Sequence, residues 1–277
     1  MKAILAARGI QLTKSLGQNF LHDANQLRRI VDAAELTKAD KVLEIGPGLG
    51  PLTELLAERA GQVLAIEKDA RLVAVLRERF HLGLGAASGL QLVHDDALEW
   101  LRRSARDWHD WKLVANLPYS VASPLLVELA LARSGPQRMV GTVQLEAARR
   151  LMAQAGDRDY GLLTLLVQLN YEPRGWFKIP AGCFFPEPEV DSACICLKRR
   201  PEPLLPPERA PAFAAIVKRS FSQRRKMMRK LLQADWPAEE VDRAFARLDP
   251  GPLPPQARAE TVTLRQFVGL TRLLSAD

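Results

Sequence analysis

Short apolar runs alternate with amphipathic stretches through the first two-thirds of the chain. The apolar runs predict buried strands at Lys41–Ile45, Val63–Ile66, Leu90–His94, Leu113–Ala115 and Met139–Val143. Stretches with helical spacing lie between them, as at Ala24–Ala34, Leu52–Ala60 and Leu72–Phe80. This alternation favours the α/β class, with a parallel sheet and helices on both of its faces. Two later runs, Tyr171–Ile179 and Ala193–Lys198, predict further strands around a loop at Gly182–Ser192.

A proline-rich segment interrupts this pattern from residue 200 onward. Its sequence, Arg-Pro-Glu-Pro-Leu-Leu-Pro-Pro-Glu, cannot form a regular helix or a central strand. Helical patterns follow at Ala212–Gln233, Ala238–Leu248 and Leu264–Leu274, with a second break at Pro250–Pro255. We therefore expect an α/β domain over residues 1–199 and a small α-helical domain over residues 200–277.

The charge of the chain suggests a polyanionic partner. The net charge is +7, and residues 200–277 hold 14 Lys and Arg against 9 Asp and Glu. The three cysteines, Cys183, Cys194 and Cys196, match neither a disulfide framework nor a zinc motif. No apolar run approaches the roughly 20 residues of a membrane helix, and no secretory signal is visible. We expect a monomeric cytoplasmic protein that binds no metal and no membrane.

A glycine-rich loop at Glu44–Gly50 follows the first predicted strand and precedes a helix. Gly46 and Gly48 let backbone N–H groups approach a ligand, and the helix N-terminus favours an anionic group. Glu67 ends the next strand, 21 residues after Gly46, where an acidic side chain can bind both ribose hydroxyls. The spacing suits S-adenosyl-L-methionine, because a dinucleotide loop needs glycine where this chain has Pro51. A nicotinamide cofactor is the alternative.

Two aspartates follow the third predicted strand, at Asp95 and Asp96. A carboxylate in this place can accept the amino hydrogens of the cofactor's adenine. A solvated loop or a helix N-cap would use the same residues. The pattern favours Asp96 as the adenine contact and leaves Asp95 as the alternative.

The tetrapeptide Asn116–Tyr119, with the sequence Asn-Leu-Pro-Tyr, follows the fourth predicted strand. Methylation of an exocyclic adenine nitrogen needs positioning and acceptors for the amino hydrogens. The amide oxygen of Asn116 and the carbonyl of Leu117 can be these acceptors, and Pro118 stiffens the loop. Tyr119 offers a ring on which a flipped base can stack. The alternative is an Asn-x-Pro turn with a buried tyrosine.

These motifs resemble those of the bacterial small-subunit ribosomal RNA adenine dimethyltransferases. The matching segments are Lys14–Leu21, Glu44–Gly50, Asp96–Ala97, Asn116–Tyr119, Phe184–Ser192, Phe221–Lys226 and Arg258–Thr261. They run nearly end to end in the order of that family. The resemblance implies a Rossmann-like methyltransferase sheet and dimethylation at N6 of two adjacent adenines near the 3′ end of small-subunit rRNA. The rRNA would be bound within a 30S precursor during ribosome biogenesis.

The resemblance also assigns residues to which the pattern gives no role. It implies cofactor contacts from Asn19 and Leu21, in addition to those from the glycine-rich loop, Glu67, Asp96 and Asn116. It implies that Phe184 pairs with Tyr119 to hold the flipped adenine. By themselves, Asn19 and Leu21 would be interpreted as a turn packed on the domain, and Phe184 as a core or loop aromatic.

The predicted helix Ala212–Gln233 is amphipathic and has a basic stripe. Such stripes are commonly solvated faces. In a net-basic domain that follows a base-modifying one, phosphate contact is the better interpretation. The RNA-contact candidates are Arg219, Arg224, Arg225, Lys226 and Arg229.

Two further alternatives remain open. A methyltransferase of the antibiotic-resistance type, acting on large-subunit rRNA, would have a similar catalytic loop. The segments Phe221–Lys226 and Arg258–Thr261 favour the small-subunit family. A non-catalytic RNA-binding assembly factor would be expected to tolerate loss of the acceptor at Asn116, and the intact tetrapeptide argues against that role.

Overall fold

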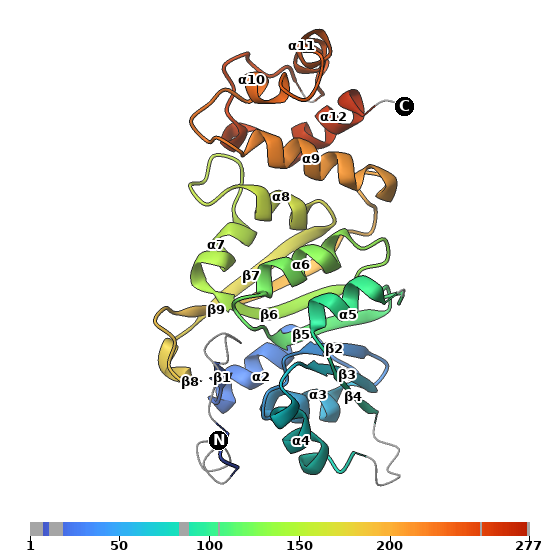
Figure 1. The fold of residues 1–277 in the computed structure, drawn as a ribbon, viewed down its shortest axis with the longest axis vertical. Coiled ribbons are helices and arrows are strands. Elements are labelled where there is room, and N and C mark those ends of the chain that lie inside the picture. Colours follow the sequence, from blue (N-terminus) through green and yellow to red (C-terminus); the bar gives the residue numbers. More distant parts are fainter. Residues whose placement is uncertain (1–7, 11–18, 83–88, 105, 250, 276–277) are drawn as a thin grey trace. The chain divides into compact units, whose positions relative to one another are not determined.

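A seven-stranded sheet forms the centre of the α/β part of the protein (Figure 1). The structure, a computed structural model, describes residues 8–10, 19–82, 89–104, 106–249 and 251–275. The sheet has the order β4-β3-β2-β5-β6-β9-β7. Its strands are β2 (Lys41–Ile45), β3 (Gln62–Glu67), β4 (Leu90–His94), β5 (Trp111–Asn116), β6 (Arg138–Gln144), β7 (Tyr171–Ile179) and β9 (Ser192–Arg199). All seven predicted strands are present, most with ends shifted by one or two residues.

The direction of the strands differs in part from the prediction. Strands β4, β3, β2, β5 and β6 pair in parallel, whereas β9 pairs antiparallel with β6. Strands β7 and β9 are neighbours in the sheet, and no crossover helix lies between them in the chain. Two neighbouring strands need such a crossover to pair in parallel. The sheet is therefore mixed, with the antiparallel strand β9 next to the predicted parallel strands.

Helices cover both faces of this sheet. The helices of the described residues, which do not all pack on the sheet, are α2 (Ala24–Ala33), α3 (Pro51–Arg59), α4 (Ala70–Arg79), α5 (Ala97–Arg103), α6 (Ala122–Leu131), α7 (Leu145–Met152), α8 (Leu162–Gln168), α9 (Ala210–Ser220), α10 (Met228–Leu232), α11 (Ala238–Arg247) and α12 (Leu264–Leu274). Consecutive residues of β2, β3 and β5 are buried, which requires a cover on each face. On one face, Val42, Val63 and Val114 form a core with Ile30 of α2 and Leu56 of α3.

The order of strands reverses between β2 and β5. Strand β2 is followed outward by β3 and β4, and β5 is followed outward by β6 on the other side. In open α/β sheets the crevice beyond the carboxyl ends of the strands at such a switch point is where ligands bind. Both the glycine-rich loop after β2 and the tetrapeptide that begins at Asn116, the last residue of β5, lie at this point.

A two-stranded sheet joins two distant parts of the chain. Strand β1 (Phe20–Leu21) pairs antiparallel with β8 (Phe184–Phe185), so Leu21 lies opposite Phe184. The pattern of apolar residues predicted neither strand, because each is only two residues long. The pairing places two segments that the resemblance assigns to the site side by side.

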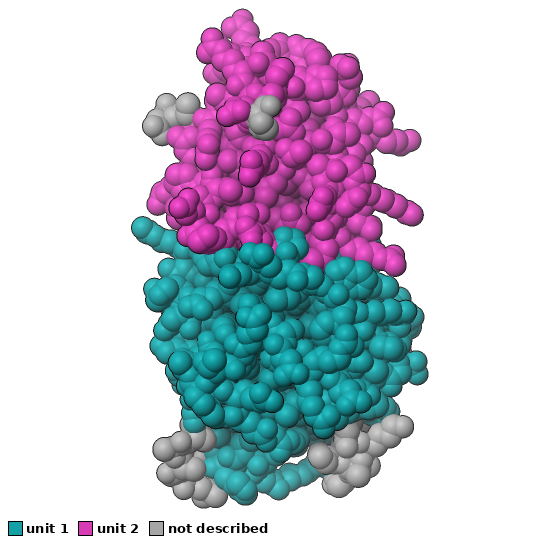
Figure 2. Space-filling view, turned by 180° about the vertical axis from the view of Figure 1, so that it is seen from behind, with its two compact units in different colours: residues 1–148, 173–199 teal, residues 149–172, 200–277 magenta. Residues whose placement is uncertain are grey.

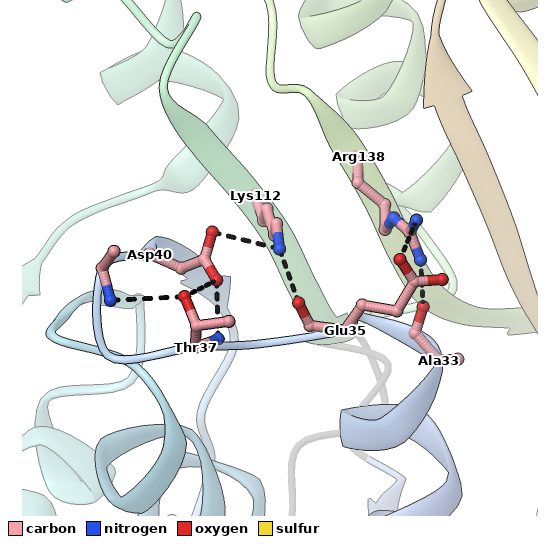
Figure 3. Close-up of polar contacts among 7 residues, drawn as sticks. Ala33, Glu35, Thr37, Asp40, Lys112 and Arg138 are labelled. Carbon is pink, nitrogen blue, oxygen red and sulfur yellow. Dashed lines mark hydrogen bonds and ion pairs between the residues drawn. The ribbon is translucent and has the colours of Figure 1, made fainter.

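The chain divides into two compact units (Figure 2). The first unit comprises residues 1–148 and 173–199, and the second comprises residues 149–172 and 200–277. The predicted boundary after residue 199 is one of the boundaries between the units. Residues 149–172, with α8 and half of α7, were assigned by sequence to the first domain, but they pack in the second unit.

The predicted helix Ala212–Gln233 is wrong as a single element. Helix α9 ends at Ser220, and α10 begins only at Met228. The intervening sequence contains good helix formers, but Phe221 packs its ring against Tyr160 and Phe267 within the second unit. These tertiary contacts override the local helical preference. The predicted basic stripe therefore does not run along one continuous helical face.

No helix among the described residues is long and apolar enough to cross a lipid bilayer.

Candidate active site

A pocket lies at the switch point of the sheet, and its lining combines the predicted cofactor loop with the predicted catalytic loop. Every residue of this lining belongs to the first unit. The lining includes Asn19, Phe20, Gly46, Gly48, Glu67, Lys68, Asp95, Asp96, Leu98, Asn116, Leu117, Pro118 and Ser120. Of the predicted cofactor residues, the lining contains all but Leu21. That residue is buried beside the pocket, in the hydrophobic core.

The glycine-rich loop needs its glycines for two reasons. Gly46 and Gly48 have φ angles of +68° and +63°, in the left-handed region that favours glycine. A Cβ atom on Gly48 would lie 2.6 Å from Cε1 of Phe20, and one on Gly46 would lie 3.1 Å from Cγ of Pro118. The loop is thus in direct contact with both the N-terminal segment and the catalytic tetrapeptide.

Glu67 is held in place by the backbone around it. Its carboxylate accepts hydrogen bonds from the N–H groups of Gly48, at 3.1 Å, and of Asp69, at 2.9 Å. The residue is 6% exposed, and burial raises the pKa of its carboxyl above the ordinary value. Glu67 also lines the pocket, where a carboxylate can accept hydrogen bonds from ribose hydroxyls.

Glu44 is the most deeply buried acidic group among the described residues, and it does not itself line the pocket. It stands at the first position of the glycine-rich motif, is 1% exposed, and its Oε2 has no hydrogen-bond partner within the described part of the chain. Burial, together with the nearby charge of Glu67, raises the pKa of Glu44 to about 8. This carboxyl is therefore mostly protonated at neutral pH.

Asp96 is a helix N-cap, as one interpretation of the aspartate pair expected, and it also lines the pocket. Its Oδ1 accepts from the N–H groups of Leu98 and Glu99, which makes it the N-cap of α5. Its Oδ2 forms an ion pair with Lys68 at 2.8 Å, and that hydrogen bond is the main cause of its lowered pKa. Asp95 lines the same pocket and pairs with Arg103.

The side-chain amide of Asn116 is oriented by contacts at both of its ends. Its Nδ2 donates to the carbonyl of Asn19 at 2.9 Å, and its Oδ1 accepts from the hydroxyl of Thr142. Strands β5 and β6 pair in register, with Asn116 opposite Thr142. The contact with Asn19 identifies which end of the amide is the oxygen, because a carbonyl can accept only from the nitrogen.

The rest of the tetrapeptide is packed against neighbouring strands. Leu117 is buried against Gly141 of β6, where an added Cβ atom would lie 3.1 Å from Cδ1 of Leu117. The phenol of Tyr119 hydrogen-bonds the buried hydroxyl of Ser192, at the start of β9. The rings of Tyr119 and Phe184 lie 6.4 Å apart at 67°, an edge-to-face contact. The structure thus brings Phe184 to the catalytic loop, although 68 residues separate it from Asn116.

Several residues of the site were missed by the sequence analysis. Phe20 covers the glycine-rich loop, Lys68 pairs with Asp96, and Thr142 contacts Asn116. Lys68 directly follows Glu67, so its position at a strand end was a usable signal. Thr142 lies inside an apolar run and has no such signal. Within the matching segment Lys14–Leu21, residues 14–18 lie outside the described residues.

The RNA-contact candidates lie in the second unit and fall into two groups. Arg219 pairs with Asp235, and Arg229 pairs with Asp242. Arg224 donates to the carbonyls of Arg158, at 2.9 Å, and Tyr160, at 3.4 Å, which ties the turn after α9 to another loop of the unit.

Arg225 and Lys226 are exposed on this turn. No ion pair or side-chain hydrogen bond joins either of them to another described residue. Of the five predicted cations, these two are the ones that other protein groups leave available for phosphate.

The chain is similar to known proteins along nearly its whole length. The family model described as "Ribosomal RNA adenine dimethylase" matches residues 9–267. The chain is 38% identical over 281 residues to the ribosomal RNA small subunit methyltransferase A of Latilactobacillus sakei, covering 99% of this chain and 93% of that protein. It is 40% identical over 280 residues to the protein of that name from Pelotomaculum thermopropionicum, covering 98% and 94%.

Solved structures share the fold. The crystal structure of the 23S rRNA methyltransferase ErmE is 29% identical, with a TM-score of 0.67, covering 93% of this chain and 100% of that one. A dimethyladenosine transferase from Plasmodium falciparum is 24% identical, with a TM-score of 0.69, covering 91% and 95%. The predicted fold class, a Rossmann-like methyltransferase sheet with C-terminal helices, is confirmed. The family match over most of the chain also confirms the predicted enzyme class, and the protein belongs to the ribosomal RNA adenine dimethylase family.

Proposed function

We propose that this protein dimethylates N6 of two adjacent adenines near the 3′ end of small-subunit rRNA, with S-adenosylmethionine as the methyl donor. One observation carries the proposal: the glycine-rich loop and the Asn-Leu-Pro-Tyr loop line a single pocket and touch through Gly46 and Pro118. A donor held by the first loop and a base held by the second would meet there. Neither loop alone would give this chemistry.

The residues of the pocket suit S-adenosylmethionine. The left-handed φ angles of Gly46 and Gly48, and the crowding that a Cβ would meet at Pro118 and Phe20, favour glycine at both positions, and a backbone without side chains can approach a ligand closely. Glu67 presents a carboxylate for the ribose hydroxyls, and Asp96 or Asp95 presents one for the adenine amino group. When bound, the cofactor supplies a methyl group activated by a sulfonium. Asn19 reaches the pocket itself, whereas Leu21 would act by supporting it.

The acceptor base is held by the tetrapeptide. Asn116 Oδ1 uses one lone pair for Thr142, and its second lone pair can accept an amino hydrogen of the target adenine. The carbonyl of Leu117 accepts the other hydrogen, which orients the nitrogen lone pair for attack. Tyr119 offers a ring on which the base can stack, and Phe184 supports that ring through their edge-to-face contact. No strong general base is needed, because the proton can leave after transfer.

The names of the relatives favour small-subunit rRNA over large-subunit rRNA. The small-subunit methyltransferases are 38% and 40% identical to this chain, against 29% for the 23S rRNA enzyme. The exposed pair Arg225 and Lys226 of the second unit supplies phosphate contacts that do not depend on sequence. Selection of the correct adenines then requires folded rRNA, as in a 30S precursor in the cytoplasm. We propose that the protein acts as a monomer.

Mass spectrometry of rRNA tests this function. Undermethylated small subunits and, separately, large subunits are incubated with the protein and labelled cofactor. We expect dimethyladenosine at two adjacent positions of small-subunit rRNA. Methylation of large-subunit rRNA alone would favour the resistance-type activity. Binding of rRNA without methyl transfer to either subunit would favour an assembly factor.

A further inference from the structure

The hydroxyl of Thr142 contacts the side-chain amide of Asn116 from outside the pocket lining. Thr142 lies in β6, is fully buried, and donates to Asn116 Oδ1. It does not line the pocket, whereas Asn116 does. Any effect of Thr142 on the reaction must therefore pass through Asn116, as is expected of a positioning residue.

The two contacts of Asn116 together determine how its amide can rotate. The carboxamide is planar, so a donor on one side of the oxygen and an acceptor on the nitrogen fix the last side-chain torsion. The carbonyl of Asn19 excludes the flipped orientation, because it would then face the amide oxygen. The hydroxyl of Thr142 fixes the angle within the remaining orientation and occupies one of the two lone pairs of Oδ1.

We propose that Thr142 is a positioning residue that sets the direction of the free lone pair of Asn116 toward the target amino group. This inference rests on the proposed function, since it assumes that Asn116 accepts a hydrogen bond from the base. Because the hydroxyl is already in place before the substrate binds, the amide need not reorient during the reaction. Valine preserves the shape of threonine but cannot donate, so the amide would lose its fixed angle.

Thr142→Val and Thr142→Ser test the proposal. We expect kcat for methyl transfer to fall about tenfold in Thr142→Val, which is the effect of losing one ordinary hydrogen bond from the transition state. KM for the cofactor should stay within about twofold of its original value, because Thr142 does not reach the pocket. Thr142→Ser retains the hydroxyl and should recover most of the rate. An unchanged kcat in Thr142→Val would overturn the proposal.

A matched control separates positioning from stability. Thr271 is likewise fully buried, and its hydroxyl donates to the carbonyl of Phe267 within α12 of the second unit. Thr271→Val removes a buried hydroxyl of the same kind with no path to Asn116. We expect similar losses of melting temperature in the two valine variants, but a loss of kcat in Thr142→Val only. Equal losses of kcat would mean that the effect is a general consequence of stability.

A double-mutant cycle and a spectroscopic signal complete the test. In single-turnover assays, Thr142→Val should have little further effect in the Asn116→Ala background, whereas additive losses would contradict a route through Asn116. The side-chain amide resonances of Asn116, assigned by their absence in Asn116→Ala, should shift in Thr142→Val. Resonances that do not move would refute the proposed contact. This signal does not require activity. A failure of the wild-type protein to methylate rRNA would therefore contradict the proposed function, whereas the resonances would still test the contact between Thr142 and Asn116.

Discussion

The ring of Phe20 lies over the Cα atom of Gly48, so closely that a Cβ on Gly48 would approach Cε1 to 2.6 Å. This relationship joins the N-terminal segment to the glycine-rich loop. It also explains a match in the family pattern: a segment that resembles an ordinary turn in isolation forms one wall of the pocket at the switch point.

We expect Gly48→Ala to weaken cofactor binding by at least about tenfold, because the left-handed backbone strains alanine by about 1–2 kcal/mol and the methyl group displaces Phe20. Isothermal titration calorimetry with S-adenosylmethionine measures the loss. Gly156→Ala is the matched control, since Gly156 also has a positive φ but would place its Cβ in open space. Similar affinities in the two variants would show that the contact with Phe20 is unimportant.

Asn116→Ala should retain the fold and reduce methyl transfer by about 100-fold or more, because it removes an acceptor aimed at the amino group. The assay uses labelled cofactor and undermethylated small subunits. Circular dichroism checks the fold. Calorimetry checks the affinity for the cofactor, because Asn116 also lines the pocket proposed to bind it. Wild-type activity in this variant would contradict the mechanism.

Neutralising Arg225 and Lys226 together should flatten the salt dependence of RNA binding. Each phosphate contact contributes about 0.7–0.9 to the slope of log K against log salt, so the slope should fall by about 1.5. Arg243→Ala with Arg247→Ala removes the same charge from α11 of the same unit and is the control.

Arg229→Ala should change the slope less, because this side chain is already paired with Asp242. An unchanged slope in the variant without Arg225 and Lys226 would remove the turn from the RNA interface. Equal changes in the two double variants would indicate a general charge effect instead of a specific contact.

Glu44 predicts a dependence of stability on pH. Its pKa is about 8 in the folded protein and 4.5 when unperturbed, so the folded state retains a proton that the unfolded state loses between these values. The free energy of unfolding therefore falls as pH rises from about 5 to 8, by up to about 1.4 kcal/mol per pH unit from this group. Glu44→Gln, which is neutral at every pH, should lack this component.

Urea unfolding of the wild type and of Glu44→Gln at several pH values measures the difference. The stability of Glu44→Gln relative to the wild type should rise through this range and level off above pH 8. Glu58→Gln, an exposed change on α3, is the control. Parallel curves for the wild type and Glu44→Gln would contradict the buried, protonated state of Glu44.

The sequence predicted the parts of the site that follow strands. The loop at Glu44–Gly50, Glu67 and the tetrapeptide at Asn116–Tyr119 each come at a strand end, and parallel strands bring such ends to one edge of a sheet. Local patterns determine where strands end, so these predictions needed no knowledge of long-range packing. Phe184 and Asn19 came instead from the resemblance to a family, since neither has a local signal.

The second unit shows where local patterns failed. A long amphipathic helix was expected through Phe221, but packing of that ring against Tyr160 and Phe267 ends α9 at Ser220. The partners lie 61 and 46 residues away in the chain, so no local pattern contains them. The same packing placed Arg225 and Lys226 on a turn instead of on a helical face.

The sequence by itself determined where the seven strands of the main sheet lie along the chain, the two loops that follow β2 and β5, and the chemistry of their side chains, because these depend on neighbours within a few residues. Only the tertiary structure decided the direction of β9, the pairing of β1 with β8, and the contact of Thr142 with Asn116. Each of these depends on segments distant in sequence that approach only when the sheet assembles. The fold also pairs the amide of Asn116 with the carbonyl of Asn19, and burial raises the pKa of Glu44.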